Sequence, residues 1–231
     1  MEKVEINSYE DLYGVLDRLN ESIDWDAFYS ERKMPAPFLV NSTLPDKAVT
    51  EFVETHDVRH ALEFGCGEGR NAIYLAKKGV EVVAVDSSRV AVDNAEKNRK
   101  GLKNARFICS DFLSVDFKDS RFDLVIDGGM FHHLPPHRRL QYRDLVKSLL
   151  KKTGYFMLLC FSAEAGGADE LDDLQFYTKR NVGVSFSEQR IRNFFDRDFE
   201  IISIEQCGCE KTDEYIDIPY LYSCLMRLKD Q

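Results

Sequence analysis

The chain has 231 residues, of which 44% are hydrophobic and 12% aromatic, so it can bury a sizeable core within one large domain. Its formal net charge of -9 argues against nucleic-acid binding, which needs clustered Lys and Arg to neutralise phosphates. No stretch approaches the roughly 18 apolar residues of a membrane span, and the start is unlike a secretory leader, so we expect a cytoplasmic protein. We also expect small neutral or cationic partners, and no nucleic-acid or membrane partner.

The first part of the chain differs in character from the rest. We expect a helical cap segment over residues 1–45 and the main domain over residues 46–231. Ser8 and Asp11 have the S-x-x-D spacing of a helix start. The apolar residues that follow fall on one helical face (Leu12, Val15, Leu16 and Leu19).

Apolar runs alternate with helical patterns through the middle of the chain, which is typical of a parallel sheet with crossover helices. The expected strands lie at residues 60–64, 81–85, 105–109, 122–126 and 155–161. Between them, helical patterns at residues 70–79, 88–101 and 135–154 each end at a glycine that suits a helix C-terminus. The sequence therefore predicts three right-handed crossovers.

After the fifth strand the pattern changes. Residues 162–181 are polar and contain glycines, so we expect a long excursion there rather than a core element. Ser187 is placed to begin a short helix. The last two apolar runs, at residues 199–205 and 220–228, have no crossover-length helix between them and should pair antiparallel.

The stretch "ALEFGCGEGRN" at residues 61–71 raises the question of which ligand its glycines approach. A dinucleotide fingerprint counted from Gly65 needs its third glycine at position 70, which is Arg70 here. Glu63 stands two residues before Gly65, at the end of a strand. A buried carboxylate needs donors such as loop amides or a ligand ammonium. It would also repel an approaching phosphate.

An acid followed by alternating glycines resembles the first motif of the class I S-adenosylmethionine-dependent methyltransferases. Their cofactor is a sulfonium amino acid joined to adenosine and has no phosphate, which suits a loop beside an acid. The resemblance covers about residues 58 to 161. It implies an α/β, Rossmann-like fold: a seven-stranded, mostly parallel sheet with an antiparallel last strand and helices on both faces.

Three more motifs match that family in its order. Asp86 ends the second strand, where the family's acid accepts both ribose hydroxyls. Asp111 follows the third strand, where the family has an acid beside the adenine, and Asp127 and Gly128 follow the fourth strand, beside the methionine part. The full cofactor-binding set that the resemblance implies is Trp25, Tyr29, Arg32, Glu63, Gly65, Cys66, Gly67, Asn71, Asp86, Ser87, Ser110, Asp111, Phe112, Asp127, Gly128 and His132.

Each motif taken singly also has a structural interpretation. Glu63 could form an ordinary ion pair at a strand end, Asp86 could be a charge at a helix N-terminus, and residues 110–112 could form a turn. The ordered coincidence of the motifs favours cofactor binding over this alternative.

The run "FHHLPPH" invites a metal interpretation, because three histidines lie close together (His132, His133 and His137). Adjacent histidines point in different directions, and no four-ligand set of suitable spacing exists, even with the "CGC" run at residues 207–209. We therefore expect no metal. His132 and His133, with Asp127, stay candidates for catalysis, and a structural role for the histidines stays open.

The segment "WDAFYSERKMPAPF" resembles the entry segment of thiopurine and tellurite methyltransferase-like members, where an aromatic residue and an arginine fold over the cofactor. Trp25 and Tyr29 are four residues apart and share a helical face, and Phe28 and Arg32 form a second such pair. Arg32 could reach the cofactor carboxylate. We expect residues about 8 to 40 to form a mobile cap, with a permanently docked amphipathic helix as the alternative.

The resemblance implies methyl transfer from S-adenosylmethionine to a small-molecule acceptor. Amino-methylating enzymes of nucleic acids and glutamine have an Asn/Asp-Pro-Pro-Tyr/Phe run after the fourth strand, whereas this chain has "DGGMF" at residues 127–131. A cofactor-binding protein without turnover and a protein or RNA methyltransferase remain alternatives. The acceptor pocket should be formed by the N-terminal segment, the loop after Asp127 and residues 162–186, and the oligomeric state is open.

Overall fold

The computed structural model describes residues 5–19, 23–31, 43–118, 120–179, 183–210 and 212–229. The elements in chain order are α1 (Tyr9–Leu19), α2 (Trp25–Glu31), α3 (Lys47–Thr55), β1 (His60–Phe64), α4 (Arg70–Lys77), β2 (Glu81–Asp86), α5 (Arg89–Asn98), β3 (Ala105–Cys109), η1 (Phe112–Ser114), β4 (Phe122–Asp127), η2 (Phe131–His133), α6 (Pro136–Leu149), β5 (Leu150–Phe161), α7 (Asp173–Thr178), α8 (Glu188–Phe195), β6 (Phe199–Gln206) and β7 (Leu221–Leu228). Within these ranges, no helix has the length and apolar character needed to cross a membrane.

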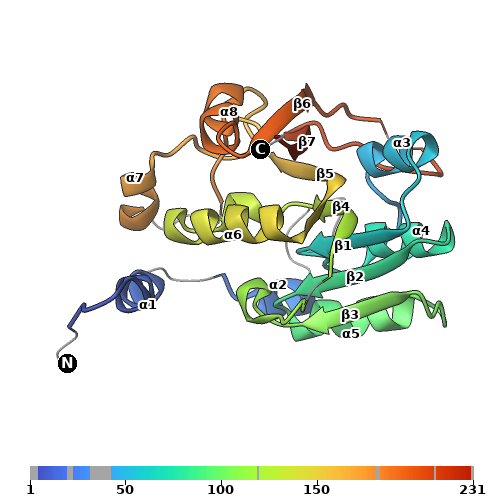
Figure 1. Cartoon of the computed structure of the whole chain (residues 1–231), viewed down its shortest axis with the longest axis horizontal. Helices are drawn as coiled ribbons and strands as arrows, with labels where there is room; N and C mark the ends of the chain where they lie inside the picture. The colour runs from blue at the N-terminus through green and yellow to red at the C-terminus, as the bar shows by residue number, and fades with distance from the viewer. Residues whose placement is uncertain are drawn as a thin grey trace.

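In the described part of the chain, seven strands form one sheet in the order β3-β2-β1-β4-β5-β7-β6 (Figure 1). β1 pairs in parallel with both β2 and β4, whereas β7 is antiparallel to both of its neighbours. The sequence prediction of a mostly parallel sheet with an antiparallel last strand is confirmed. The strand order reverses between β1 and β4, and open α/β sheets bind ligands outside the carboxyl ends of the strands at such a point.

Helices cover both faces of the sheet, as expected (Figure 1). On one face, α3, α4 and α5 contribute side chains such as Phe52 and Leu75 to an apolar cluster. On the other face, α6 and α8 contribute Tyr142 and Phe195 to a second cluster. Burying one such side chain stabilises the fold by about 1.5–3 kcal/mol. The two clusters therefore fix the strand ends from which the site loops begin.

The third crossover helix ends earlier than its sequence pattern indicates. α6 ends at Leu149 and β5 begins at Leu150, so Gly154 lies inside a strand and the expectation of a helix up to that glycine was wrong. Leu150 is buried and pairs with Phe122 of β4, which favours strand geometry at this point. A Cβ on Gly154 would lie 2.7 Å from the carbonyl oxygen of Phe122, so the glycine lets the two strands approach closely.

The segment after β5 is more ordered than expected. α7 begins with a capping box between Asp172 and Gln175, and an isolated parallel bridge joins Ser162 to Phe186. Phe176 and Phe186 are buried in the core cluster of α6 and α8. The expectation that residues 162–181 are no part of the core was therefore wrong, because Leu171 and Phe176 are buried in this cluster, although Leu174 is exposed.

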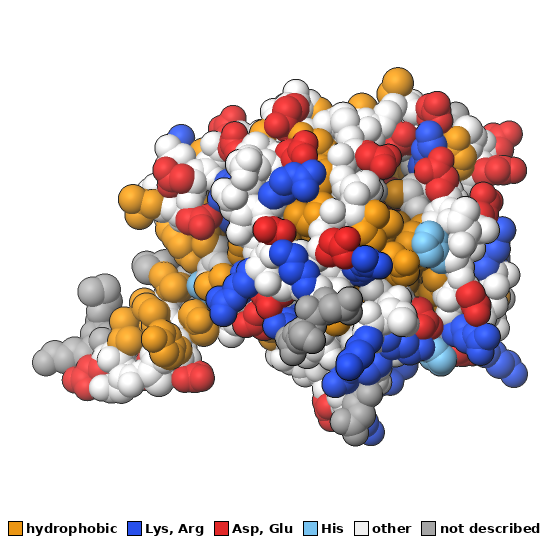
Figure 2. All heavy atoms as spheres, turned by 45° about the horizontal axis from the view of Figure 1, so that its top comes forward, with side chains coloured by type: hydrophobic (Ala, Val, Ile, Leu, Met, Phe, Trp, Pro, Cys, Tyr) orange, Lys and Arg blue, Asp and Glu red, His pale blue; other side chains and the backbone are white. Residues whose placement is uncertain are grey.

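The N-terminal helix α1 docks on α6. Its start is the expected capping box: the Ser8 hydroxyl accepts from the Asp11 amide, and the Asp11 carboxylate accepts from the Ser8 amide. Asp17 of α1 accepts from Arg138 of α6 at 2.8 Å and lies 3.0 Å from the His137 ring. Figure 2 shows α1 standing out from the body, with hydrophobic side chains where the two meet.

Candidate cofactor-binding site

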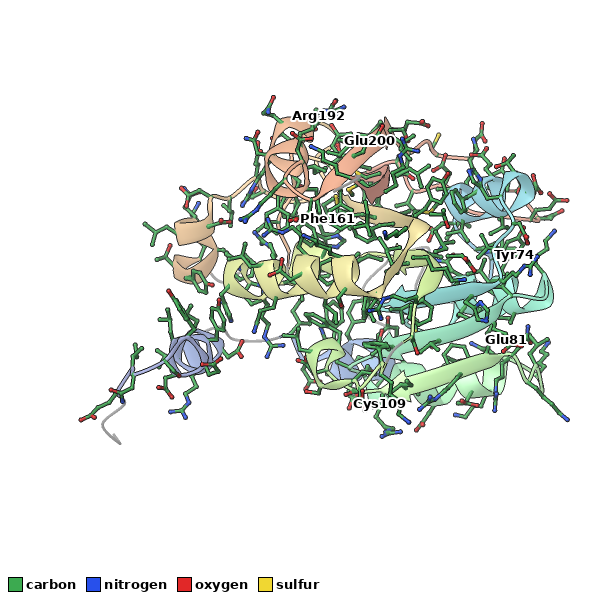
Figure 3. All side chains as sticks on the ribbon, in the orientation of Figure 1. Tyr74, Glu81, Cys109, Phe161, Arg192 and Glu200 are labelled. Atoms are coloured by element: carbon green, nitrogen blue, oxygen red, sulfur yellow. The ribbon has the colours of Figure 1, made fainter. Side chains whose placement is uncertain are left out.

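A cavity of about 680 Å³ lies at the carboxyl ends of the central strands, within the roughly 300–1,000 Å³ of typical ligand pockets. Figure 3 shows Cys109 and Phe161, the last residues of β3 and β5, well away from Glu81, the first residue of β2. The cavity brings together most of the site residues expected from the sequence: Trp25, Tyr29, Glu63, Gly65, Cys66, Gly67, Asp86, Ser87, Ser110, Asp111, Phe112, Gly128, His132 and His133.

Three expected site residues are not part of that lining. Asn71 and Asp127 lie behind the cavity wall, where each bonds to groups that form the wall. Arg32 lies outside the described residues, so its contact with a cofactor carboxylate stays a prediction.

The loop between β1 and α4 requires glycine for two reasons. Gly65 and Gly67 have φ of +64° and +53°, a left-handed conformation that side chains rarely adopt. A Cβ on Gly67 would lie 2.6 Å from the Tyr29 hydroxyl oxygen, and one on Gly65 would lie 2.7 Å from the Met130 Cβ. The loop therefore leaves room for backbone, but not for side chains, between α2 and the β4 loop.

Glu63 is held by the start of α4. Its Oε1 accepts from the Asn71 side chain at 2.9 Å, and its Oε2 accepts from the Ala72 amide at 3.0 Å. Asn71 also donates to Asp46, which in turn accepts from Arg70 at 2.6 Å. One helix amide and one side-chain amide thus supply the donors that the sequence required for this acid, and Asp46, which sequence reasoning missed, completes the network.

Burial raises the pKa of Glu63 to about 8, although the hydrogen bond from Asn71 and the charge of Arg70 act in the opposite direction. A cation next to this carboxyl would favour its ionised form. Glu63 therefore suits the ammonium or sulfonium of an amino-acid cofactor and disfavours a phosphate.

We predict a pH dependence of cofactor affinity that originates in Glu63. Between about pH 6 and 7.5 the cofactor amine stays mostly protonated, while ionisation of Glu63 costs less as the pH approaches its pKa of about 8. Affinity for S-adenosylmethionine should rise with pH, by up to about tenfold per unit. Calorimetric titration at several pH values measures this, and Glu63→Gln should flatten the dependence.

The same group should affect stability with the opposite sign. Between pH 4.5, the ordinary pKa of a glutamate, and about pH 8, its pKa in the folded state, the folded chain holds a proton on Glu63 that the unfolded chain has lost. The free energy of unfolding without cofactor should therefore fall as pH rises through this window. The role of Glu63 would be contradicted if stability varied with pH in the same way in the wild type and in Glu63→Gln, and if cofactor affinity did so too.

Asp86 closes β2 beside the glycine loop. One carboxylate oxygen accepts from the Gly67 amide at 2.8 Å, and the other accepts from the Ser88 amide at 2.9 Å. Burial raises the pKa of Asp86, against these two hydrogen bonds. Each oxygen keeps a second lone pair, and the residue lines the cavity. Asp86 can thus accept two hydroxyls of a ribose while the loop amides hold it in place.

Asp111 and Phe112 form the end of the cavity next to β3. Asp111 caps η1 by accepting from the Leu113 amide at 2.9 Å, and Phe112 is 5% exposed. Arg138 donates to Asp111 and also to Asp17 of α1. A carboxylate and an aromatic ring at this end suit an adenine, and Arg138 connects it to the N-terminal helix.

Asp127 orders the loop after β4. Its carboxylate accepts from the amides of Gly129, Met130 and Phe131, and from the Tyr142 hydroxyl at 2.8 Å. The side chain is fully buried, and burial raises its pKa to about 6 against these hydrogen bonds. The geometry makes Asp127 a positioning residue for the loop that carries Gly129 and Met130 into the cavity wall.

The adjacent histidines have different environments. His132 is buried and stacks on Phe161 with ring centroids 3.7 Å apart, and its Nδ1 accepts from the Phe161 amide at 3.3 Å. Burial lowers the pKa of His132 well below its usual value, so its ring is neutral. The His133 ring contacts Trp25 edge-on at 4.9 Å. Both line the cavity, and both stay candidates for a role in the reaction.

The short helix α2 forms a side of the cavity. Asp26 accepts from the Ser88 hydroxyl at 2.6 Å and from the Val90 amide at 3.2 Å, which holds α2 against the N-terminus of α5. Trp25 and Tyr29 both line the cavity, as their four-residue spacing predicts. Tyr29 is buried, and burial raises the pKa of its hydroxyl.

Further lining residues come from two segments where the sequence places the acceptor pocket, the loop after Asp127 and residues 162–186: Gly129, Met130, Ala165, Gly166, Gly167 and Ala168. Sequence reasoning missed the lining residues at the end of β5 and around the start of β7: Phe161, Ile218, Tyr220 and Leu221. The run "AGGA" at residues 165–168 was a usable signal, because small residues in a loop leave space for a ligand.

Comparison with known proteins agrees with this geometry. Residues 61–154 match a family model described as "Methyltransferase domain". The chain is 28% identical over 189 residues to probable thiol methyltransferase 2 of Arabidopsis thaliana, covering 78% of this chain and 81% of the relative. The chain is also 28% identical over 124 residues to the 2-heptyl-1-hydroxyquinolin-4(1H)-one methyltransferase of Mycobacteroides abscessus. That match covers 52% of this chain and only 55% of the relative.

A solved structure extends the similarity over the whole fold. The 1,6-didemethyltoxoflavin-N1-methyltransferase of Burkholderia thailandensis, with bound 1,6-didemethyltoxoflavin and S-adenosylhomocysteine, superimposes with a TM-score of 0.67 at 18% identity, covering 100% of this chain and 94% of that one. Residues 61–154 therefore form a methyltransferase domain, and the sheet order and the glycine loop with its acids support a class I S-adenosylmethionine-dependent methyltransferase.

Proposed function

We propose that the chain transfers the methyl group of S-adenosylmethionine to a small-molecule acceptor. The observation that carries the proposal is that one cavity joins the cofactor side, with Glu63 and Asp86, to an uncharged part lined by Trp25, His133 and Phe161. Two similar proteins support it, since one is named for a hydroxyquinolinone and the other holds a small acceptor beside S-adenosylhomocysteine.

When bound, S-adenosylmethionine supplies a methyl group made electrophilic by its sulfonium. An accepting heteroatom forms a bond to the methyl carbon while the carbon–sulfur bond breaks, its electron pair stays on sulfur, and the acceptor's proton leaves to water. The protein's part is to orient both reactants and to exclude bulk water. Asp86 would fix the ribose, Glu63 would face the cationic end, and Trp25 and Phe28 would cover the acceptor.

Labelled methyl transfer tests this function. Full-length protein with S-adenosylmethionine carrying an isotopic methyl should label a component of a small-molecule extract, and Asp86→Ala should lower the rate in proportion to lost cofactor binding. Label in added protein or RNA instead would contradict the small-molecule acceptor. Cofactor binding with no transfer to any fraction would favour the interaction alternative.

We also propose that the N-terminal segment completes the site as a mobile cap. Its described part attaches to the domain as two separate helices: Asp26 of α2 bonds to the start of α5, and Asp17 of α1 bonds to α6. Such a segment can open locally at low cost. A cover that closes over bound cofactor would exclude water and hold the acceptor in line with the methyl group.

Hydrogen exchange should detect this closure. Protection of residues 8–31 is expected to rise when S-adenosylhomocysteine binds, because the ligand adds contacts to Trp25 and Tyr29, while residues 81–85 of β2 stay equally protected throughout. Asp26→Ala should lower protection in the unliganded protein. A segment equally protected with and without ligand would mean a permanently docked helix.

A further inference from the structure

The cavity has two chemically different parts. Every charged residue of its described lining belongs to the cofactor side (Glu63, Glu68, Arg70, Asp86 and Asp111). The described residues that line the other part, on α2, the β4 loop, the β5 end and the segment before β7, include no Lys, Arg, Asp or Glu. An acceptor bound there meets no described ion-pair partner.

Aromatic rings follow one another along the wall of this second part. Phe28 contacts Trp25 at 5.4 Å between ring centroids, and Trp25 contacts His133 at 4.9 Å. His133 contacts Phe161 at 5.8 Å, and Phe161 contacts Tyr220 at 6.0 Å. These five rings come from four separate segments of the chain. Their faces and edges offer the stacking and edge-to-face contacts that another aromatic ring prefers.

Small residues form another side of this part of the cavity. Ala165, Gly166, Gly167 and Ala168 line it in sequence. A Cβ on Gly167 would lie 2.9 Å from the Tyr220 carbonyl oxygen, so the loop runs close to the segment before β7. The Ala168 amide donates to the Ser185 hydroxyl at 2.8 Å, and that hydroxyl donates to the Ala168 carbonyl at 2.7 Å. The loop is thus held in place and leaves room for a ligand.

We propose that the acceptor is an uncharged, planar aromatic or heteroaromatic molecule that binds between the aromatic wall (Phe28, Trp25, His133, Phe161 and Tyr220) and the small-residue loop at residues 165–168. This inference rests on the proposed function and names its substrate class. Burying a carboxylate in this part would be costly, because no described cation lines it. A saturated ring of similar size would lose the contacts between ring faces and edges.

The residues that line this part of the cavity also limit how the accepting atom can lose a proton. The described lining of this part includes the imidazole of His133 but no carboxylate or ammonium, so it suits an acceptor whose heteroatom needs no base stronger than an imidazole, such as a thiol, an acidic ring hydroxyl or a ring nitrogen. In the transfer this atom bonds to the methyl carbon, the sulfonium becomes a neutral thioether, and any proton on the accepting atom passes to solvent.

Calorimetry on the full chain saturated with S-adenosylhomocysteine tests the binding class without requiring turnover. The probes are 2-naphthol, decahydro-2-naphthol, 6-hydroxy-2-naphthoate and 6-hydroxy-2-naphthamide. We expect 2-naphthol to bind about tenfold more tightly than its saturated analogue. The affinity for the uncharged amide should be at least about tenfold higher than that for the carboxylate of equal size. Trp25, the only tryptophan, gives a second readout through its fluorescence.

Two variants locate the site. Ala168→Leu should fill the space beside the aromatic wall and weaken 2-naphthol binding at least about tenfold, with S-adenosylhomocysteine affinity unchanged. Ala163→Leu is the matched control, because Ala163 is in the same loop but not in the described lining. It should change neither affinity.

The outcomes separate this inference from the proposed function. Failure of S-adenosylhomocysteine to bind would contradict the proposed function before any probe is added. If it binds, three results would each overturn the aromatic-acceptor proposal alone: no probe binds, the carboxylate binds as tightly as the amide, or Ala168→Leu leaves 2-naphthol binding unchanged. The aromatic-acceptor proposal would be supported if the probes bind in the expected order, and if Ala168→Leu abolishes that order while Ala163→Leu does not.

Discussion

Replacing Asp86 by alanine is expected to weaken S-adenosylmethionine binding by about 1 to 3 kcal/mol, through loss of two charge-assisted hydrogen bonds to ribose hydroxyls. The carboxylate lines the cavity, and amides of Gly67 and Ser88 already hold it in position. Its removal also leaves those two amides without their acceptor. Isothermal titration of the purified variant measures the change.

A control with the same loss of charge distinguishes this contact from a general field effect. Asp93 is exposed on α5, in the helix that follows Asp86. Asp93→Ala should leave cofactor affinity within about 0.5 kcal/mol of the wild type. Unchanged affinity in Asp86→Ala, with the variant shown to be folded, would remove Asp86 from the binding site.

Replacing Asp127 by alanine is expected to lower the free energy of unfolding by about 3 kcal/mol or more. The change removes the acceptor for the buried Tyr142 hydroxyl and for the amides of Gly129, Met130 and Phe131. A buried donor left without a partner costs about 1–3 kcal/mol. Denaturant unfolding measures the loss, and the β4 loop should lose protection from hydrogen exchange at the same time.

Asp144 provides the matched control, because its side chain is 70% exposed and has only a long contact, of 3.7 Å, with Arg143. Asp144→Ala should change stability by less than about 1 kcal/mol. Full stability of Asp127→Ala combined with loss of methyl transfer would point to direct participation of Asp127 in the reaction rather than to positioning of the loop.

Much of the fold could be predicted from the sequence because its signals are local. The apolar runs of β1 to β4 and the capping box of Ser8 and Asp11 each depend on neighbouring residues, and the structure has them where expected. The end of α6 could not be predicted in this way. Its boundary depends on pairing between Leu150 and Phe122, which are distant in sequence.

In the candidate site, too, residues within local motifs could be predicted, and residues placed by long-range pairing could not. Residues within motifs, such as Glu63 and Asp86, could be found from spacing, because the loop after a strand end places them at the cavity. The aromatic wall could be predicted only in part: Trp25 and His133 lie in motifs, whereas Phe161 and Tyr220 are strand and loop residues without a motif, and sheet pairing brings their rings to 6.0 Å. Asp46 was missed for the same reason.

We propose that the charged part of the cavity holds the cofactor and that the aromatic part faces its methyl group. A crystal structure of the full chain with S-adenosylhomocysteine tests it most directly. We predict both ribose hydroxyls within about 3.2 Å of the Asp86 carboxylate, the adenine beside Asp111 and Phe112, and the sulfur directed toward Trp25 and His133. A ribose without contact to Asp86, or a sulfur that points away from the aromatic wall, would contradict the account.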